Sequence, residues 1–284
     1  MKEQARQARA EDRIVGLVPT MGALHRGHLA LIERARRECS AVIASLFVNP
    51  KQFGPAEDFS KYPRTFDNDR EKLEKAGADL LFAPEASEIY PQGFSSYVQV
   101  DGLSERLEGR SRPGHFRGVA TVVMKLLQIV QPTFAYFGRK DAQQSRIITL
   151  MSRDLNLDSE IVVCPIVREP DGLAMSSRNA YLNAEERKAA TVLHRALDAA
   201  KNEMAAGVRD ALQLQTVLHR VLGAEKAARV DYAEIVDAET FEPVVRVGKP
   251  SCIVLAVLIG KTRLIDNLYI EPKEPGSDEL LFHL

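Results

Sequence analysis

Tryptophan is absent from this 284-residue sequence, cysteine is scarce, and neither sign of charge dominates. The 38 basic and 39 acidic residues leave a net charge of −1, which argues against a general nucleic-acid-binding protein, because such proteins normally carry a basic face. Three scattered cysteines, Cys39, Cys164 and Cys252, provide no disulfide framework and fit a reducing compartment. Cys164 lies in an apolar stretch, where an inert core thiol is expected.

Long apolar runs are also missing. No stretch reaches the roughly 18 apolar residues that a membrane-spanning helix needs, and the best candidate, Cys252–Gly260, has the length of a strand. The N-terminus is charged and lacks the apolar segment of a secretory signal. With 45% hydrophobic residues, the chain is expected to be a cytoplasmic globular protein without membrane partners.

The first two thirds of the sequence alternate between strand-like and helical patterns. Alternation of this kind predicts right-handed crossovers and an α/β, doubly wound parallel sheet of the Rossmann type. The expected strands are 14–18, 41–48, 79–83, 133–137 and 160–167, and the expected helices are 28–37, 71–76, 119–129 and 142–155.

The pattern changes after Arg178. Two amphipathic helices, 184–205 and 208–223, precede three strand-like runs at 230–236, 252–258 and 264–269. Helices followed by strands indicate a smaller α+β domain. We therefore expect one domain over 1–179 and a second over 180–284.

A segment rich in glycine and histidine, Val18–His28, joins the first expected strand to the first helix. Ligands bind outside the carboxyl ends of strands in such sheets, and the N-terminus of the next helix favours phosphate. His25 and His28, three residues apart, are expected on one face, where they can donate hydrogen bonds to phosphoryl oxygens. A tight turn with solvated histidines and a zinc-binding pair remain alternatives, although no third zinc ligand is obvious nearby.

Two further segments have polar residues suited to phosphate. In Phe137–Gln144, Gly138 precedes Lys140 after an expected strand, although a solvated turn with a helix cap explains the same residues. In Met175–Asn179, two hydroxyls stand beside a guanidinium. The latter segment is equally compatible with an interdomain linker or a mobile loop.

Taken together, the segments PTMGALHRGH, FVNPKQF, RPGHFRGV, FGRKDAQQ and GLAMSSRN resemble the pantothenate synthetase (pantoate–β-alanine ligase) family. The resemblance extends from about Ile14 to Asn179 and continues more loosely to the end. His-x-Gly-His alone marks only the wider nucleotidyltransferase superfamily. The resemblance implies ATP-dependent condensation of (R)-pantoate with β-alanine to pantothenate, through a pantoyl adenylate, with release of AMP and pyrophosphate.

The resemblance also implies roles for individual residues. His28 is the family's proposed proton donor, His25 stabilises phosphoryl charge, and Lys140 lies on the phosphates as the third catalytic residue. Gln52 and Gln144 match the two amides that hold pantoate, and amides can both donate and accept hydrogen bonds. The residues implied at the ATP site are Met21, Gly22, Ala23, Leu24, His25, Arg26, Gly27, His28, Gly138, Arg139, Lys140, Asp141, Val167, Met175, Ser176, Ser177 and Arg178.

Other expectations accompany the resemblance. It implies Mg²⁺ with ATP and a homodimer. The metal ligands stay unassigned, because Asp67 and Asp69, which lie in a stretch that helps to hold Mg²⁺ in some relatives, also fit a solvated helix start. Arg139 departs from the acidic residue usual at that position and reverses the charge beside Lys140, which is expected to change the local affinity for phosphate. His115 fits either the pocket or a structural role.

Several side chains have competing interpretations. Phe137, Val122 and Val123 suit an apolar wall for the methyl groups of pantoate, but the valines also suit helix core. His194 and His219 are expected on the surface. Two other functions stay open: a nucleotidyltransferase acting on a phosphate acceptor, which would favour Arg or Lys in place of the two glutamines, and a non-catalytic nucleotide- or tRNA-binding module.

Overall fold

The computed structural model describes residues 1–55, 57–274, 277 and 279–284. The chain divides into two compact units, Met1–Cys164 and Pro165–Leu284. The division precedes the expected boundary at residue 180, because the segment after Cys164 packs on the second unit. There, Leu173 joins the hydrophobic core, and Arg168 forms a bidentate ion pair with Asp266 at 2.8 and 2.9 Å.

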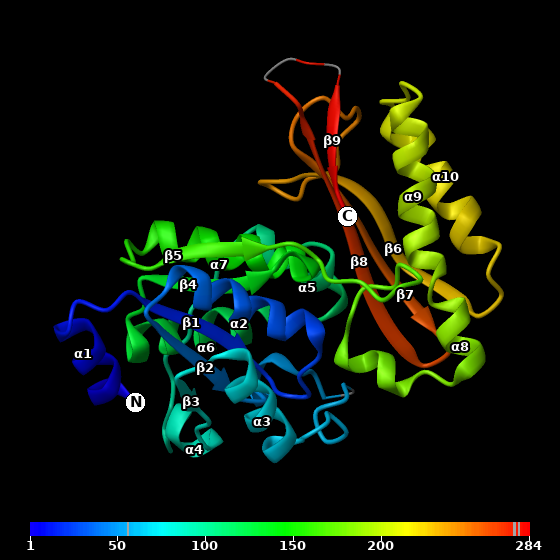
Figure 1. Cartoon of the computed structure of the whole chain (residues 1–284). Helices are drawn as coiled ribbons and strands as arrows, with labels where there is room; N and C mark the ends of the chain where they lie inside the picture. The colour runs from blue at the N-terminus through cyan, green and yellow to red at the C-terminus, as the bar shows by residue number, and fades with distance from the viewer. Residues whose placement is uncertain (56, 275–276, 278) are drawn as a thin grey trace. The chain divides into compact units, whose positions relative to one another are not determined.

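The first unit contains a five-stranded parallel sheet in the order β3-β2-β1-β4-β5 (Figure 1). Its strands are β1 (Val15–Thr20), β2 (Ala41–Leu46), β3 (Leu80–Phe82), β4 (Phe134–Gly138) and β5 (Glu160–Cys164). The chain fills one side of β1 first and then returns to place β4 on the other side. The carboxyl ends of β1 and β4 therefore form a topological switch point, where ligands bind in such sheets.

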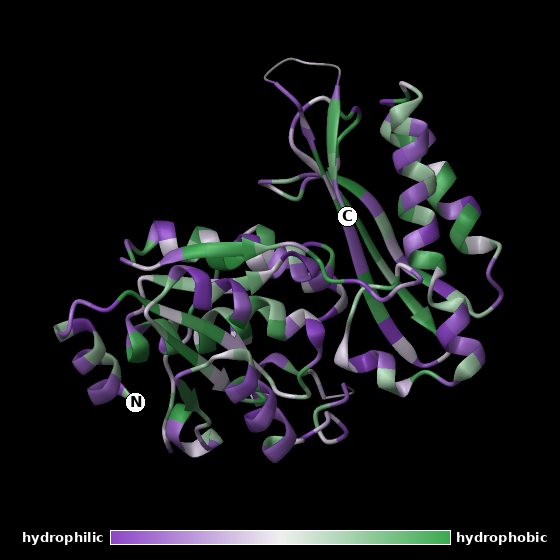
Figure 2. Ribbon diagram, viewed as in Figure 1, coloured by the Kyte–Doolittle hydropathy of each residue, from purple (hydrophilic) through white to green (hydrophobic). Residues whose placement is uncertain are grey.

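Helices cover both faces of this sheet, which confirms the expected α/β class. One core cluster combines α2 (Arg26–Glu38) and α3 (Phe66–Ala76) with the sheet. The other combines α1 (Lys2–Ala10), α6 (His115–Val130) and α7 (Ala142–Asp154). The short helices are α4 (Ala86–Ile89) and α5 (Glu108–Ser111). Figure 2 shows the apolar strands between helices whose outer surfaces are largely hydrophilic.

The second unit is an antiparallel sheet in the order β6-β7-β8-β9, packed with helices around one core. This arrangement confirms the expected α+β class. The strands are β6 (Ala228–Asp237), β7 (Ser251–Ile259), β8 (Thr262–Pro272) and β9 (Leu280–His283), and the helices are α8 (Ala184–Ala189), α9 (Val192–Ala205) and α10 (Ala211–Gly223).

Some elements differ from the sequence-based expectation. The helix α1 and the strand β9 were not expected, and the single helix predicted over 184–205 is divided into α8 and α9. Pro165 ends β5 earlier than predicted, since proline cannot donate to a strand ladder. None of the helices in the described ranges combines the length and the apolar character needed to cross a membrane.

Candidate functional site

The two histidines of the first segment form the start of α2. His25 is the residue that caps the helix, and its Nδ1 accepts a hydrogen bond from the backbone N–H of Gly27 at 3.2 Å. In return, Nδ1 of His28 accepts from the backbone N–H of His25 at 3.3 Å. The two rings face each other with centroids 4.0 Å apart. The predicted convergence of the two imidazoles on one face is therefore confirmed.

Both imidazoles are neutral near pH 7. Burial lowers the pKa of His25 to about 3, with further lowering by His28 and by the ammonium of Lys140. Burial, Lys140 and Lys72 lower the pKa of His28 to about 4. Because each Nδ1 accepts a hydrogen bond, the ring hydrogen must lie on Nε2. Each ring consequently offers an N–H donor to a ligand without carrying a charge.

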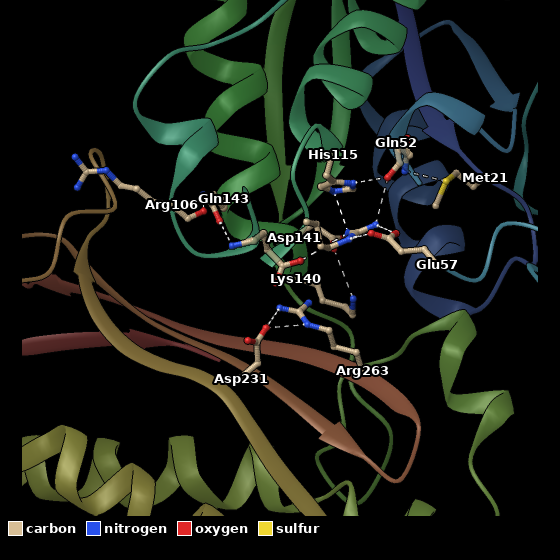
Figure 3. A network of polar contacts seen from close by, with 12 residues as sticks. Met21, Gln52, Glu57, Arg106, His115, Lys140, Asp141, Gln143, Asp231 and Arg263 are labelled. Atoms are coloured by element: carbon tan, nitrogen blue, oxygen red, sulfur yellow. Dashed lines mark hydrogen bonds and ion pairs between the residues drawn. The ribbon is translucent and has the colours of Figure 1, made fainter. Parts of the chain in front are cut away.

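The second segment meets the first at the switch point. It forms a 3₁₀ turn, Arg139–Asp141, directly after β4. The charge of Lys140 acts on both His25 and His28, and its Nζ lies 3.7 Å from Oδ1 of Asp141 (Figure 3). Two of the three predicted phosphate segments therefore converge within the first unit, at the ends of adjacent strands.

The loop from β1 to α2 is held by α3. Asp69 is fully buried, and its carboxylate accepts hydrogen bonds from the backbone N–H groups of Ala23 and Leu24, both at 2.8 Å. Lys72 donates to the backbone oxygen of Leu24 at 2.7 Å. The solvated helix start considered for Asp67 and Asp69 is therefore wrong for Asp69 and correct for Asp67, whose side chain is 90% exposed.

Gln52 is buried in the turn Pro50–Gln52, and its amide has a defined orientation. Its Oε1 accepts a hydrogen bond from Asn49 Nδ2 at 3.1 Å, while Nε2 donates to the sulfur of Met21 at 3.1 Å. Asn49 is itself fixed, because its Oδ1 accepts from the hydroxyl of Tyr90 at 2.7 Å and its Nδ2 also donates to the backbone oxygen of Gly118. The N–H side of Gln52 thus lies next to the loop that contains His25.

His115 supports the same turn from α6. Its Nδ1 lies 2.8 Å from the backbone oxygen of Gln52 (Figure 3). Its Nε2 lies 3.1 Å from Arg112, which is paired with Glu57. Burial, together with the charge of Arg112, lowers the pKa of His115 to about 4, so the neutral ring donates from Nδ1 and accepts at Nε2. The structural interpretation of His115 is therefore supported.

The two neighbouring glutamines of the second segment differ in environment. Gln143 is buried and holds a loop, because its Nε2 donates to the backbone oxygens of Leu103 and Arg106 and its Oε1 accepts from the N–H of Glu108. Gln144 is only partly buried. The assignment of Gln144 to pantoate stays a prediction. It agrees with the hydrogen bonds of Gln143, whose amide is fully used in holding the loop.

The third predicted segment belongs to the second unit. Gly172 has φ +89° in a turn closed by a bridge between Arg168 and Ala174. After Met175, the hydroxyl of Ser176 caps the 3₁₀ turn Ser177–Tyr181 by accepting from the N–H of Arg178. The segment is part of this unit, and its role toward a nucleotide stays a prediction, as does that of Val167.

The remaining candidates are mostly structural. Phe137, Val122 and Val123 are buried in the core cluster that contains α6, so the core interpretation is supported. His219 is exposed, as expected. The surface position expected for His194 is wrong, because its side chain is only 20% exposed and lies 3.2 Å from Asp198.

No group of three or more His, Cys, Asp or Glu side chains within the described residues could hold a metal ion. A zinc site at His25 and His28 would need at least one further ligand, and the described residues supply none. The oxygens of Asp69 are likewise occupied by N–H donors. Mg²⁺ bound chiefly by substrate phosphates remains compatible with these residues.

Comparison with known proteins identifies the family. Residues 1–269 match the model of the pantoate–β-alanine ligase family. The chain belongs to this family. A pantothenate synthetase from Chloroflexus aurantiacus is 56% identical over 267 residues, which cover 94% of this chain and 95% of the relative. One from Thermotoga neapolitana is 52% identical over the same shares of the two chains. The resemblance inferred from the motifs is confirmed, and the chain is an enzyme of the ligase class.

Solved structures of the family have the same fold. The crystal structure of pantothenate synthetase from Thermus thermophilus has a TM-score of 0.89 and 50% identity, covering 93% of this chain and 96% of that one. A pantoate–β-alanine ligase from Francisella tularensis, complexed with β,γ ATP and β-alanine, has a TM-score of 0.76 and 35% identity over 94% of both chains. Asn49, Lys72, Tyr90 and Arg112 were missed by sequence reasoning. Of these, Asn49 and Arg112 had a signal, their places in the FVNPKQF and RPGHFRGV motifs.

Proposed function

We propose that this chain catalyses the ATP-dependent condensation of (R)-pantoate with β-alanine to pantothenate, through a pantoyl adenylate. Membership in the pantoate–β-alanine ligase family supports the reaction. The observation in this chain that carries the proposal is the convergence of His25, His28 and Lys140 at the switch point between β1 and β4. These residues supply two neutral donors and one cation at the place where a doubly wound sheet binds nucleotides.

In the first step, the carboxylate of pantoate attacks the α-phosphorus of ATP and pyrophosphate leaves. Negative charge on the phosphoryl oxygens grows in the transition state, and donors aimed at that charge lower the barrier. The Nε2–H groups of His25 and His28 are such donors. Given the lowered pKa of His28, the neutral ring acts through its hydrogen bond. Lys140 lies on the phosphates.

In the second step, the amine of β-alanine attacks the acyl carbon and AMP leaves. Gln52 and Gln144 hold pantoate during both steps, and Gln52 also meets β-alanine. The amide of Gln52 is already oriented, with Oε1 toward Asn49 and Nε2 toward the sulfur of Met21. Because Asn49 and His115 fix this turn, little conformational freedom is lost when the substrate binds.

The full ATP site comprises the residues that the resemblance implies in all three segments, with Asp141 on the ribose. Ala23 and Leu24 contact the nucleotide through groups other than their backbone N–H, since Asp69 already binds these. Mg²⁺ enters with ATP as part of the substrate and neutralises phosphate charge.

Assembly and location complete the proposal. The active protein is a homodimer, as the family resemblance implies, and light scattering should give twice the chain mass of 31.5 kDa. Three buried free thiols, Cys39, Cys164 and Cys252, favour a reducing compartment, the cytoplasm.

Product analysis tests the reaction. Purified protein with MgATP should release pyrophosphate only when pantoate is present, and AMP only when β-alanine follows. Several other small hydroxy acids serve as controls for the acid. Transfer of AMP to a phosphate acceptor would identify a nucleotidyltransferase instead, and nucleotide binding without turnover would identify a non-catalytic module.

A further inference from the structure

The carboxylate of Asp69, in α3, is held by donors from the loop that precedes α2. It has no exposed surface, and it accepts three hydrogen bonds: Oδ1 from Leu24 N–H at 2.8 Å, and Oδ2 from Ala23 N–H at 2.8 Å and Thr65 Oγ1 at 3.0 Å. A buried carboxylate is costly unless its oxygens are satisfied by donors. Here two of the three donors belong to consecutive backbone groups of a single loop.

That loop has an unusual backbone. Gly22 and Ala23 adopt positive φ angles of +82° and +50°, and such a conformation is unfavourable for alanine. Strained backbone persists where surrounding contacts determine it. The two hydrogen bonds to Asp69 supply such contacts, and a Cβ on Gly22 would lie 3.1 Å from Asp69 Oδ2. The conformation of the loop and the position of the carboxylate are therefore matched.

The loop leads directly to His25, which begins α2. Asp69 fixes the N–H groups of residues 23 and 24, and Lys72, one helical turn further along α3, fixes the oxygen of Leu24. The negative charge of Asp69 thus binds backbone N–H groups of this loop, and the positive charge of Lys72 binds the next backbone oxygen. Displacement of this loop would move His25 and, through their mutual capping, His28.

We propose that Asp69 is a positioning residue for the nucleotide site, which sets the path of residues 21–25 and thereby the places of the Nε2–H groups of His25 and His28. The inference rests on the proposed function, in which those groups contact the phosphates of ATP. A metal-ligand role disagrees with this geometry, because both oxygens of Asp69 face hydrogen-bond donors, which repel a cation.

The test compares Asp69→Asn with Asp67→Asn. Both substitutions remove one carboxylate charge from the first turn of α3, but Asp67 is 90% exposed. In Asp69→Asn, the amide NH₂ faces a donor that was previously satisfied. We expect kcat/KM for ATP to fall about tenfold or more, the scale of one buried donor left without a partner, while KM for pantoate stays within about twofold. Asp67→Asn should retain wild-type kinetics.

Three outcomes would overturn the inference. They are wild-type ATP kinetics in Asp69→Asn, equal losses in both variants, and recovery of Asp69→Asn by excess Mg²⁺, which would identify a metal ligand. Calorimetric titration with ATP provides a readout that does not need turnover, and weaker ATP binding is expected in Asp69→Asn alone. If the wild-type protein released no pyrophosphate with pantoate, the proposed function would fail, while the titration would still test the positioning role.

Hydrogen exchange of the wild-type protein tests the same contact without any variant. The amides of Ala23 and Leu24 should exchange slowly in the absence of nucleotide, because the acceptor that they share is buried. Exchange at the rate of an unprotected loop would refute the inference even if Asp69→Asn failed to fold.

Discussion

The backbone N–H of His25 donates to Nδ1 of His28, and the two rings lie 4.0 Å apart. This reciprocal capping uses the Nδ1 atom of each ring for structure and leaves each Nε2–H for the ligand. Helix capping and phosphate recognition are therefore performed by opposite edges of the same side chains. It also explains why the segment needs both histidines at a spacing of three.

The lowered pKa values of His25 and His28 predict that kcat/KM for ATP stays nearly constant as the pH falls below 7. An ordinary histidine gains a proton near pH 6.5, whereas His25 and His28 have pKa values of about 3 and 4. They therefore stay neutral as the pH falls through 6.5. We expect kcat/KM for ATP in the pantoate-dependent release of pyrophosphate to change less than about twofold between pH 8 and pH 5.5. An inflection near pH 6.5 that tracks these residues would contradict the assignment.

The same shifts predict that stability depends on pH. Below pH 6.5, His25, His28 and His115 take up protons when unfolded but stay neutral in the folded protein, because burial lowers their pKa values to about 3 to 4. The unfolded state then binds more protons, so the free energy of unfolding decreases as the pH falls from 6.5 toward 4. Urea titrations across this range measure the decrease, which should be smaller in His115→Asn.

Substitutions of His28 distinguish two roles for its ring: a neutral hydrogen-bond donor and a group that transfers a proton. His28→Ala should lower the rate of ligation by about 10²-fold or more, the scale of one lost transition-state donor. His28→Gln places an amide N–H near the former Nε2 and should retain more activity than His28→Ala. The exposed His219 provides the control, since His219→Ala should leave the rate unchanged. Equal losses in both His28 variants would show that proton transfer is required.

Lys140 and Arg139 are adjacent cations with different expected roles. Lys140→Met should lower the rate of ligation by about 10²-fold, because it removes the charge next to His25 and His28. Arg139→Glu, which restores the acidic residue usual in the family, should alter kcat/KM for ATP by less than about tenfold. Steady-state kinetics of both variants measure the difference. A larger loss in Arg139→Glu would mean that this chain binds phosphate through Arg139.

The two glutamines of α7 should separate substrate binding from stability. Gln144→Ala should raise KM for pantoate more than KM for ATP and leave the melting temperature unchanged. Gln143→Ala should destabilise the fold by about 1–3 kcal/mol, because it leaves buried backbone partners unsatisfied. Kinetics and thermal unfolding of both variants distinguish the two roles. Equal effects on both substrates in Gln144→Ala would count against its assignment to pantoate.

Local signals in the sequence explain what could be predicted. Alternating strand and helix patterns determine an α/β sheet followed by an α+β unit, since periodicity records which faces are buried. The spacing of His25 and His28 determines their common face, because residues three apart lie together on a helix. Family motifs identify the reaction class, because each motif is contiguous.

Contacts distant in sequence required the tertiary structure. Asp69 and Asp67 are two carboxylates in one helical turn, and only the packing of α3 against the loop from β1 buries the first and exposes the second. Gln143 and Gln144 are likewise equivalent in sequence until a loop closes over one of them. The boundary at Cys164 depends on where Leu173 packs. Partners remote along the chain leave no local periodicity, so burial and hydrogen bonding decided these roles.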